Sequence, residues 1–232
     1  LALAISVSAQ ATDTTSPLNE VVVTASRVAQ TVGVDNAYIQ VITSEEIQSS
    51  GAQSVTDVLR RAAVIQVVDT SSNGSSPVIG MRGFGSNGSQ NVLVLLDGHR
   101  INNETDIGSV NLRNLSIIDI ERIEIVNGSS GALFGAGAVG GVINIITKTA
   151  TKNQLDVSIS RGNYDTEKYR ARGSVQKGSW SIVVNGDKET SDNYRDNNEL
   201  NSVFGQLRLA FEGQHFDSYV EVSKLNQNAN LP

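Results

Sequence analysis

The sequence has no cysteine among its 232 residues, so neither a disulfide framework nor a thiolate site can form. Its only histidines are His99 and His215, which argues against a metal site built from imidazole ligands. No apolar run approaches the roughly 18 residues of a membrane-spanning helix, so a helical membrane protein is excluded. Lys and Arg number 18 against 24 Asp and Glu, and this mildly acidic balance argues against a general nucleic-acid binder.

The centre of the chain is predicted to be a small mixed domain built on strands. Residues 92–96 are all apolar and run directly into Asp97 and Gly98, a pair that favours a tight turn. Their length, β-branched content and abrupt end favour a strand that is buried on both faces over a buried helix. The same pattern returns at residues 140–148, and residues 118–126 mix isoleucines with charged residues.

Two short surface helices are predicted after a strand at residues 38–43. Thr43 or Ser44 is a suitable N-cap for the first helix. Ser54 is a suitable N-cap for the second helix, which is predicted over residues 54–61.

The N-terminal part of the chain is predicted to lie outside this domain. Residues 1–11 read LALAISVSAQA and end in an A-x-A site, which indicates the remaining part of a secretory signal peptide. The alternative is a short strand or helix of the mature domain. Residues 12–19 are polar and predicted to be disordered. Residues 20–27 carry three successive valines, which can add as a strand to the sheet edge of a partner or form an ordinary first strand.

In the last third of the chain, apolar and polar residues alternate strictly, first at residues 155–159 and then at residues 169–175. Segments of about ten residues with charges opposite the apolar face predict strands between lipid and a wet lumen. Tight turns are predicted at residues 177–178 and 213–214, and a long polar loop at residues 187–199. Short turns alternating with long loops are typical of outer-membrane barrels. A soluble antiparallel sheet is the alternative.

Several of these motifs resemble the N-terminal region of TonB-dependent outer-membrane receptors. They occur in the order found in that family, and the resemblance covers more than half of the chain. The matching segments are residues 54–61 (family pattern svtdvLrr), 81–83 (iRG), 92–102 (vlvliDGvrln), 120–128 (ieriEvvrG) and 131–148 (salyGsgAiGGviNIiTk).

The sequence departs from the family pattern at two places. Residues 62–64 read AAV where the family usually has Pro-Gly-Val, and residues 127–129 read NGS where it usually has Arg-Gly-Pro. The second departure removes an arginine and any contact that this arginine makes in the family, but it leaves the fold prediction unchanged.

The resemblance implies an α+β plug domain at residues 38–148, a mixed sheet with short helices. At residues 149–232 it implies the first antiparallel strands of a transmembrane β-barrel, about five of about 22. It implies a receptor, not an enzyme, surrounded by lipid in the outer membrane of a Gram-negative bacterium. The expected ligand is a scarce metal chelate, most readily a ferric siderophore, with cobalamin or heme as alternatives.

The resemblance also implies a partner, the inner-membrane protein TonB, which energises uptake. TonB is expected to pair with a TonB box in the periplasmic arm, residues 12–37. The residues of this box are Glu20, Val21, Val22, Val23, Thr24 and Ala25.

Further roles are implied inside the plug, where Arg82, Asp97 and Arg122 are expected to be buried or to lie in the interface with the barrel. The residues with structural roles are Arg82, Gly83, Asp97, Gly98, Arg122, Glu124, Gly128, Gly135, Gly140, Gly141 and Asn144. Candidate ligand-facing residues are Phe84, Asn87 and His99. No resident cofactor is expected, and the weak calcium candidates are Asp192, Asp196 and Glu199 in the acidic loop.

One motif points to a different class of protein. Residues 135–140 spell the G-x-G-x-x-G of a dinucleotide site, and Asp156 follows about twenty residues later. That fingerprint needs a helix N-terminus for the phosphate, whereas the β-branched residues 142–146 follow here. The sequence therefore favours tight turns and close packing at these glycines. A soluble dinucleotide enzyme and a secreted β-rich binding protein are the rival classes.

Overall fold

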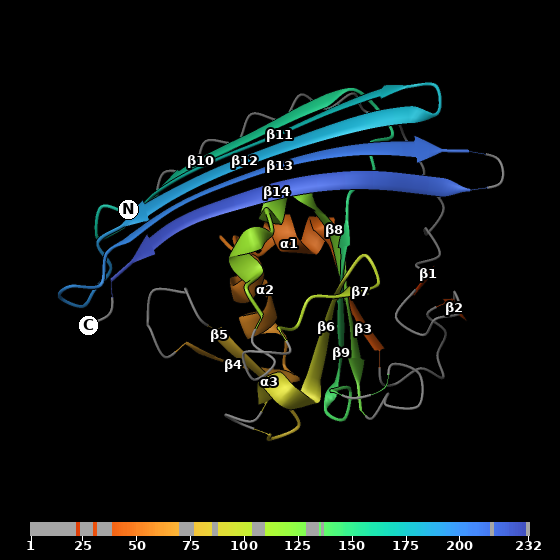
Figure 1. Cartoon of the computed structure of the whole chain (residues 1–232). Coiled ribbons are helices and arrows are strands. Elements are labelled where there is room, and N and C mark those ends of the chain that lie inside the picture. The colour runs from red at the N-terminus through yellow and green to blue at the C-terminus, as the bar shows by residue number, and fades with distance from the viewer. Residues whose placement is uncertain are drawn as a thin grey trace.

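The computed structural model describes residues 22–23, 30–31, 39–69, 77–84, 88–103, 110–128, 135, 137–213 and 216–230. They form an N-terminal domain, residues 39–150, and a long sheet, residues 154–230, that lies across one side of this domain (Figure 1). No helix in the described part of the chain is long and apolar enough to cross a membrane.

A mixed five-stranded sheet forms the centre of the N-terminal domain. Its order is β3 (Ile39–Thr43), β8 (Ile120–Asn127), β9 (Gly141–Thr147), β6 (Val92–Leu96) and β7 (His99–Arg100). β6 and β9 are parallel, and the other neighbours are antiparallel. Both of these parallel strands are buried on their two faces, which explains why they read as continuous apolar runs.

Two hydrophobic clusters lie on the opposite faces of this sheet. The larger cluster contains Ile123, Ile143 and Ile145 together with residues from the helices, and the smaller contains Leu93 and Val142. The strand and the turn predicted around residues 92–98 are therefore confirmed.

Both predicted helices and their N-caps are confirmed. Helix α1 (Ser44–Ser49) begins with a capping box, in which Thr43 and Glu46 each accept a hydrogen bond from the backbone N–H of the other. Helix α2 (Val55–Arg61) begins at Ser54, whose hydroxyl accepts from the backbone N–H of Asp57.

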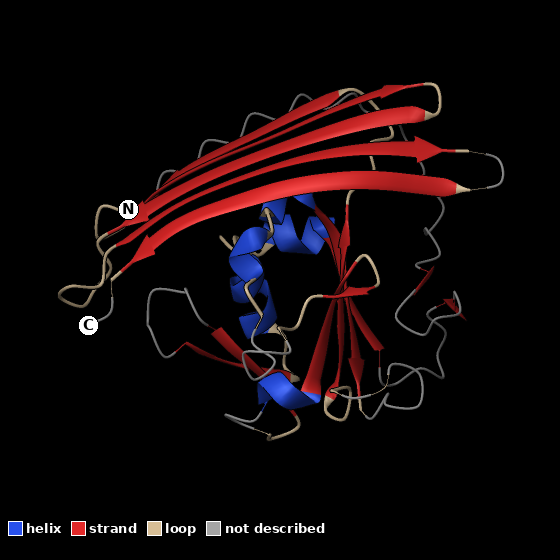
Figure 2. Ribbon diagram, in the orientation of Figure 1, coloured by secondary structure: helices blue, strands red, loops and turns tan. Residues whose placement is uncertain are grey.

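Several short elements complete the N-terminal domain (Figure 2). They are the helices α3 (Gly88–Asn91), η2 (Leu112–Asn114) and η3 (Ile117–Asp119), and the antiparallel strands β4 (Ile65–Asp69) and β5 (Pro77–Met81). The sequence did not predict β4 and β5, because neither segment alternates strictly between apolar and polar residues.

The long sheet is an antiparallel meander. Its strands are β10 (Gln154–Arg161), β11 (Glu167–Lys177), β12 (Trp180–Ser191), β13 (Leu200–Glu212) and β14 (Asp217–Ala229). The face away from the N-terminal domain exposes apolar side chains such as Ile182 and Leu207. The face toward that domain buries polar side chains such as Arg172 and Gln206. The predicted alternation is confirmed, with the apolar residues on the outside.

The long polar loop predicted at residues 187–199 begins too early. β12 continues to Ser191, so the connection to β13 contains only residues 192–199. Asp187 and Glu189 belong to the inward face of the strand, where they meet polar partners on the N-terminal domain. Their charges therefore reflect a polar interface and not a solvated loop.

A short antiparallel ribbon precedes the N-terminal domain, formed by β1 (Val22–Val23) and β2 (Gln30–Thr31). In Figure 1 it lies toward the end of the molecule where β11 turns into β12 and β13 turns into β14. The predicted signal segment at residues 1–11, the polar residues 12–19 and the other four residues of the predicted TonB box lie outside the described residues.

Candidate functional site at the interface of the N-terminal domain and the long sheet

The Asp97–Gly98 turn brings a carboxylate of the N-terminal domain to the long sheet. Asp97 has a φ of 48° and Gly98 a φ of 80°, as this tight turn requires. The two carboxylate oxygens of Asp97 accept hydrogen bonds from the backbone N–H and the hydroxyl of Thr147, each at 2.8 Å. Arg208 of β13 donates to the same carboxylate at 3.0 Å. This carboxylate is thus fixed by its own domain and presented to the sheet.

Arg208 is itself held in place by the neighbouring strand. Its Nε donates to Glu221 of β14 at 2.8 Å, and its guanidinium lies 5.2 Å from the ring centroid of Tyr219. An arginine placed between two carboxylates and an aromatic ring is pre-oriented, so little side-chain entropy is lost when it meets Asp97.

Behind this turn, a chain of buried polar groups crosses the central sheet. Asn144 accepts from the backbone N–H of Gly98 at 3.1 Å and donates to Glu124 at 3.3 Å. The side chain of Glu124 is fully buried, and Arg122 pairs with it at 2.9 Å. Because an unpaired buried charge is costly, this network fixes the relative positions of β6, β8 and β9.

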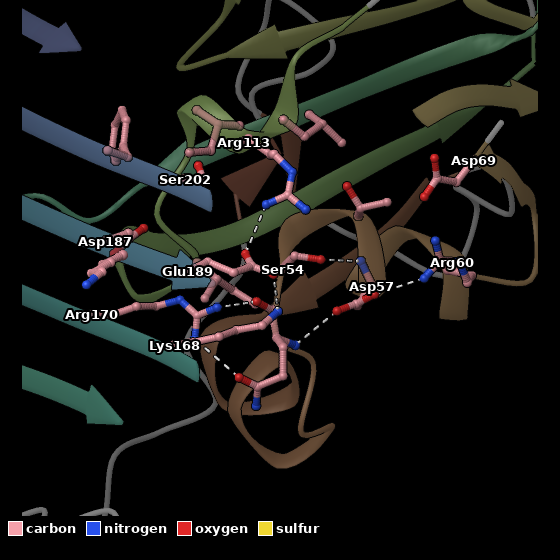
Figure 3. Close-up of a pocket in the computed structure, with 17 residues that line it drawn as sticks. Ser54, Asp57, Arg60, Asp69, Arg113, Lys168, Arg170, Asp187, Glu189 and Ser202 are labelled. Atoms are coloured by element: carbon pink, nitrogen blue, oxygen red, sulfur yellow. Dashed lines mark hydrogen bonds and ion pairs between the residues drawn. The ribbon is translucent and has the colours of Figure 1, made fainter. Parts of the chain in front are cut away.

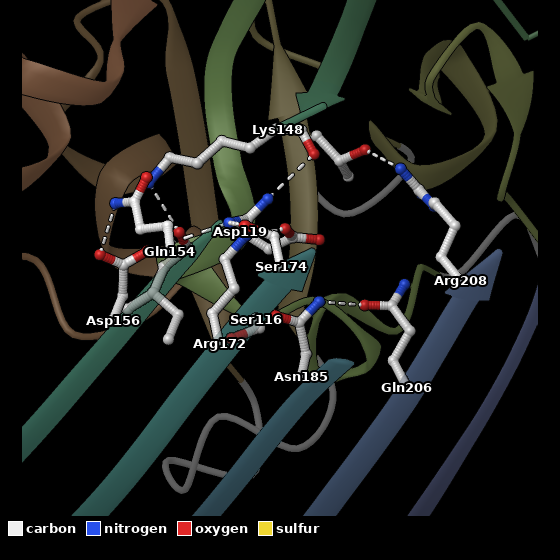
Figure 4. Close-up of polar contacts among 12 residues, drawn as sticks. Ser116, Asp119, Lys148, Gln154, Asp156, Arg172, Ser174, Asn185, Gln206 and Arg208 are labelled. Atoms are coloured by element: carbon white, nitrogen blue, oxygen red, sulfur yellow. Dashed lines mark hydrogen bonds and ion pairs between the residues drawn. The ribbon is translucent and has the colours of Figure 1, made fainter. Parts of the chain in front are cut away.

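A second ion pair joins the two parts where the N-terminal domain ends (Figure 4). Arg172 of β11 donates to Asp119 at 2.6 Å, and the two side chains are 3% and 4% exposed. Arg172 also donates to the backbone carbonyl of Lys148 at 3.3 Å, while the ammonium of Lys148 donates to the carbonyl of Ile118 at 2.8 Å.

Burial shifts the pKa values of Asp119 and Lys148, which lie where the N-terminal domain ends. It raises the pKa of Asp119 above its ordinary 3.8, and the hydrogen bond from Arg172 limits that rise. Burial also lowers the pKa of Lys148 below its ordinary 10.5. In both groups burial disfavours the charged form, and oppositely charged neighbours counteract this effect.

A polar cavity of about 260 Å³ lies in the same interface, between helix α2, η2 and the strands β11 to β13 (Figure 3). Glu189 pairs there with Arg113 of the N-terminal domain and with Lys168 of β11, each at 3.0 Å. Nearby, the Ser116 hydroxyl donates to Asp187 at 2.9 Å. A cavity of this size with polar walls has room for several water molecules.

The chemistry of this interface differs from that of the domain core. Both hydrophobic clusters are built from the N-terminal domain alone, and no described residue of the long sheet belongs to either. The sheet contacts the domain mainly through ion pairs and hydrogen bonds, and its inner face adds a few buried apolar side chains such as Val183 and Phe204. When such groups separate, water rehydrates them, and this offsets much of the lost attraction. The N-terminal domain therefore has a tightly packed core of its own but a largely polar contact with the sheet.

The structure places the other predicted site residues away from the contacts with the long sheet. Arg82 is exposed in the turn after β5, with a φ of 53°, and its guanidinium lies beside Gly128. His99 is exposed on β7, with its Nδ1 3.1 Å from the carbonyl oxygen of Asp97. Phe84 packs against Gly140, and Asn87 lies outside the described residues.

The predicted structural glycines occupy turns and close contacts. Positive φ angles occur at Gly83, Gly98, Gly128 and Gly135, and Gly140 and Gly141 are buried. β9 begins directly at Gly141. The helix that a dinucleotide site needs after residue 140 is thus replaced by a strand, as the sequence indicated.

The connection between β12 and β13 carries the three weak calcium candidates. No three His, Asp or Glu side chains of the described residues gather closely enough to hold an ion, and Asp192, Asp196 and Glu199 are all exposed.

Comparison with known proteins identifies the class to which this arrangement belongs. Residues 35–142 match the TonB-dependent Receptor Plug Domain family. The chain is 37% identical over 165 residues to the vitamin B12 transporter BtuB of Vibrio vulnificus strain CMCP6, an alignment that covers 68% of this chain and 26% of that protein. It is 31% identical over 183 residues to BtuB of Vibrio cholerae strain N16961, covering 77% and 29%.

Solved structures share the fold at lower identity. The siderophore receptor PirA of Acinetobacter baumannii matches with a TM-score of 0.64 and 22% identity, covering 84% of this chain and 32% of that one. FpvA of P. aeruginosa, in complex with heterologous pyoverdines, matches with a TM-score of 0.69 and 21% identity, covering 88% and 26%.

The chain belongs to the TonB-dependent receptor family. Its N-terminal domain is the plug domain, and the long sheet corresponds to the first barrel strands. The chain spans between about a quarter and a third of the length of the relatives named above. The family consists of receptors and transporters of the Gram-negative outer membrane that depend on TonB.

Proposed function

We propose that this chain forms the plug and the first barrel strands of an outer-membrane receptor that takes up a metal chelate with energy supplied through TonB. The observation that carries the proposal is the contrast between a plug with its own hydrophobic core and a polar contact with the barrel strands. A plug that must block the lumen at rest and loosen during transport needs both properties.

Cobalamin is the first ligand to test. The relatives that are 31% to 37% identical to this chain over the aligned residues are named vitamin B12 transporters. The ferric siderophore expected from the sequence is the second candidate, since siderophore receptors have the same fold. Fold similarity at 18% to 24% identity carries less weight than sequence similarity for the choice of ligand.

We further propose that residues 20–25 bind TonB by strand addition, with the box on the periplasmic side. Two features support this. The described part of the box, Val22–Val23, is already extended as β1. In Figure 1 it lies toward the end of the molecule with the tight connections between barrel strands, and short turns face the periplasm in outer-membrane barrels.

Uptake in cells that express the protein but no other receptor for the ligand tests this proposal. Val22→Pro removes an N–H and is expected to lower uptake of labelled cyanocobalamin to the level of a strain without TonB. Val22→Thr keeps the N–H and the β-branched shape, so it should transport normally. Gln30→Pro disturbs the β1–β2 ribbon but leaves the box intact, and it should also transport.

Each outcome has a separate meaning. Uptake by Val22→Pro at the rate of the unaltered protein would refute the box assignment. No cobalamin uptake by the unaltered protein, together with TonB-dependent growth on a ferric siderophore, would replace the first ligand by the second. Uptake that persists without TonB would refute the proposed function as a whole.

A further inference from the structure

The outward face of the barrel strands carries cations at one end of its apolar band. Along β12 the exposed outward residues are Trp180, Ile182 and Val184, then Gly186 and finally Lys188 near the connection to β13. β14 repeats this order, since exposed valines at positions 220 and 222 precede the exposed lysine at position 224. On both strands the apolar band therefore ends in a lysine.

The strand pairing relates these two lysines to an arginine on β10. We call a set of paired residues whose side chains all lie on the outward face an outward row. Lys188 is paired with Tyr169. Lys224 is paired with Gly205, and this row is the next one toward the tight turns. Arg161 lies one outward row from Lys188 in the opposite direction. The cations thus shift by two residues for every two strands, which is one residue per strand.

This stagger places the three cations at one depth in a membrane. Barrel strands tilt by about 35–45°, which displaces residues of equal depth by about one residue from each strand to the next. Arg161, Lys188 and Lys224, here named the cation belt, therefore form a line parallel to the membrane plane, on every second strand.

Aromatic residues mark the opposite border of the apolar band. Trp180 and Phe216 are both exposed, and each precedes the belt lysine of its own strand by the same interval. With a rise of about 3.3 Å per residue and a tilt of about 40°, this interval of about eight residues is about 20 Å along the barrel axis. An apolar band in an outer-membrane barrel is about 25 Å tall, with aromatic residues at its borders. The cation belt thus lies at the level of lipid head groups.

The belt carries a surplus of positive charge. Arg161 pairs with Glu167, but neither Lys188 nor Lys224 forms a salt bridge with any residue that the structure describes. The carboxylates of the acidic connection follow the end of β12 and lie farther from the apolar band. Two lysines facing lipid at head-group depth are suited to anionic head groups.

We propose that the cation belt binds the phosphate groups of the glycolipid in the outer leaflet of the outer membrane, with Lys188 and Lys224 as the principal contacts. This inference rests on the outer-membrane placement proposed above. The outer leaflet is chosen because the belt lies at the end opposite the tight turns, which face the periplasm. Lysine suits the task because its ammonium binds phosphate as a point charge.

The test measures binding of purified phosphorylated glycolipid to the protein in mild detergent. The double variant Lys188→Gln, Lys224→Gln is expected to bind about 30-fold more weakly, since each lysine near an anionic surface contributes about 1 kcal/mol and 1.4 kcal/mol is tenfold. Lys177→Gln is the matched control, an exposed lysine at the opposite end of β11, and it should bind as the unaltered protein does. Dephosphorylated glycolipid should bind about as weakly as the double variant binds the phosphorylated form.

Three results would overturn the proposal. The first is binding by the double variant that is as tight as binding by the unaltered protein. The second is a loss of binding in Lys177→Gln as large as that in the double variant. The third is binding of dephosphorylated glycolipid that is as tight as binding of the phosphorylated form. Equally tight binding of phosphatidylglycerol would assign the belt to any anionic lipid and reject the outer-leaflet source. Trp180 is the only tryptophan of these 232 residues, so a variant that keeps tryptophan at this position alone, quenched by brominated lipids in vesicles, reports insertion separately. Absence of quenching would refute the membrane placement itself, and the belt with it.

Discussion

Replacement of Arg172 by methionine should loosen the hold of the barrel strands on the plug domain. Arg172 is almost fully buried and is the partner of Asp119, so the variant leaves a buried carboxylate with no cation at hydrogen-bond distance. Removal of one partner from a buried ion pair costs about 3–5 kcal/mol. At about 1.4 kcal/mol for each factor of ten, residues 117–127 should open about 10² to 10³·⁵ times more often.

Amide hydrogen exchange measured by mass spectrometry, on the protein in detergent, reads this opening directly. Exchange in residues 117–127 should accelerate in Arg172→Met by the factor given above. The double variant Asp119→Leu, Arg172→Met should recover most of the protection, because an apolar pair in place of a buried ion pair is often neutral or stabilising. Arg161→Met breaks an exposed ion pair of the same sheet and should leave the exchange of this segment unchanged.

Two outcomes would refute this reasoning. If Arg172→Met accelerated exchange by less than tenfold, the ion pair would contribute little to docking of the plug. If the double variant lost as much protection as the two single variants combined, Asp119 and Arg172 would act independently despite their 2.6 Å contact.

Two further predictions concern single residues of the plug domain. Because burial raises the pKa of Asp119, the folded state binds more protons than the unfolded state between pH 3.8 and the raised pKa, so stability should fall as pH rises through this window. Exchange of residues 117–127 should therefore accelerate with pH more steeply in the unaltered protein than in Asp119→Asn, and identical profiles would contradict the shift. Gly141→Ala should destabilise the plug by about 1–3 kcal/mol, because a Cβ there would lie 2.5 Å from the carbonyl oxygen of Val126 and 2.8 Å from the sulfur of Met81. Urea unfolding measures this loss, and an unchanged midpoint would show that the backbone yields at no cost.

Local chemistry determined a large part of this structure. The Asp97–Gly98 turn forms because these two residue types tolerate positive φ. The N-caps at Thr43 and Ser54 form because a hydroxyl reaches an N–H three residues ahead. The strict alternation after residue 154 determined both the strands and which face of each is apolar. All of these are short-range effects, so the sequence alone was enough to predict them.

Tertiary structure decided the interface and everything that depends on pairing between distant residues. The alternation placed Arg172 and Arg208 on the polar face of their strands, but only the fold brings them to Asp119 and Asp97. The sequence predicted Glu189 in a loop, whereas in the folded chain it lies in β12 and pairs with residues of two other elements.

The cation belt depends on the tertiary structure in the same way. Arg161, Lys188 and Lys224 are far apart in the sequence, and only the pairing register of five strands places them at one depth. Sequence patterns report which face a side chain occupies, since this follows from the backbone period. Which side chain lies opposite is set by long-range packing, and for that reason only the tertiary structure could decide it.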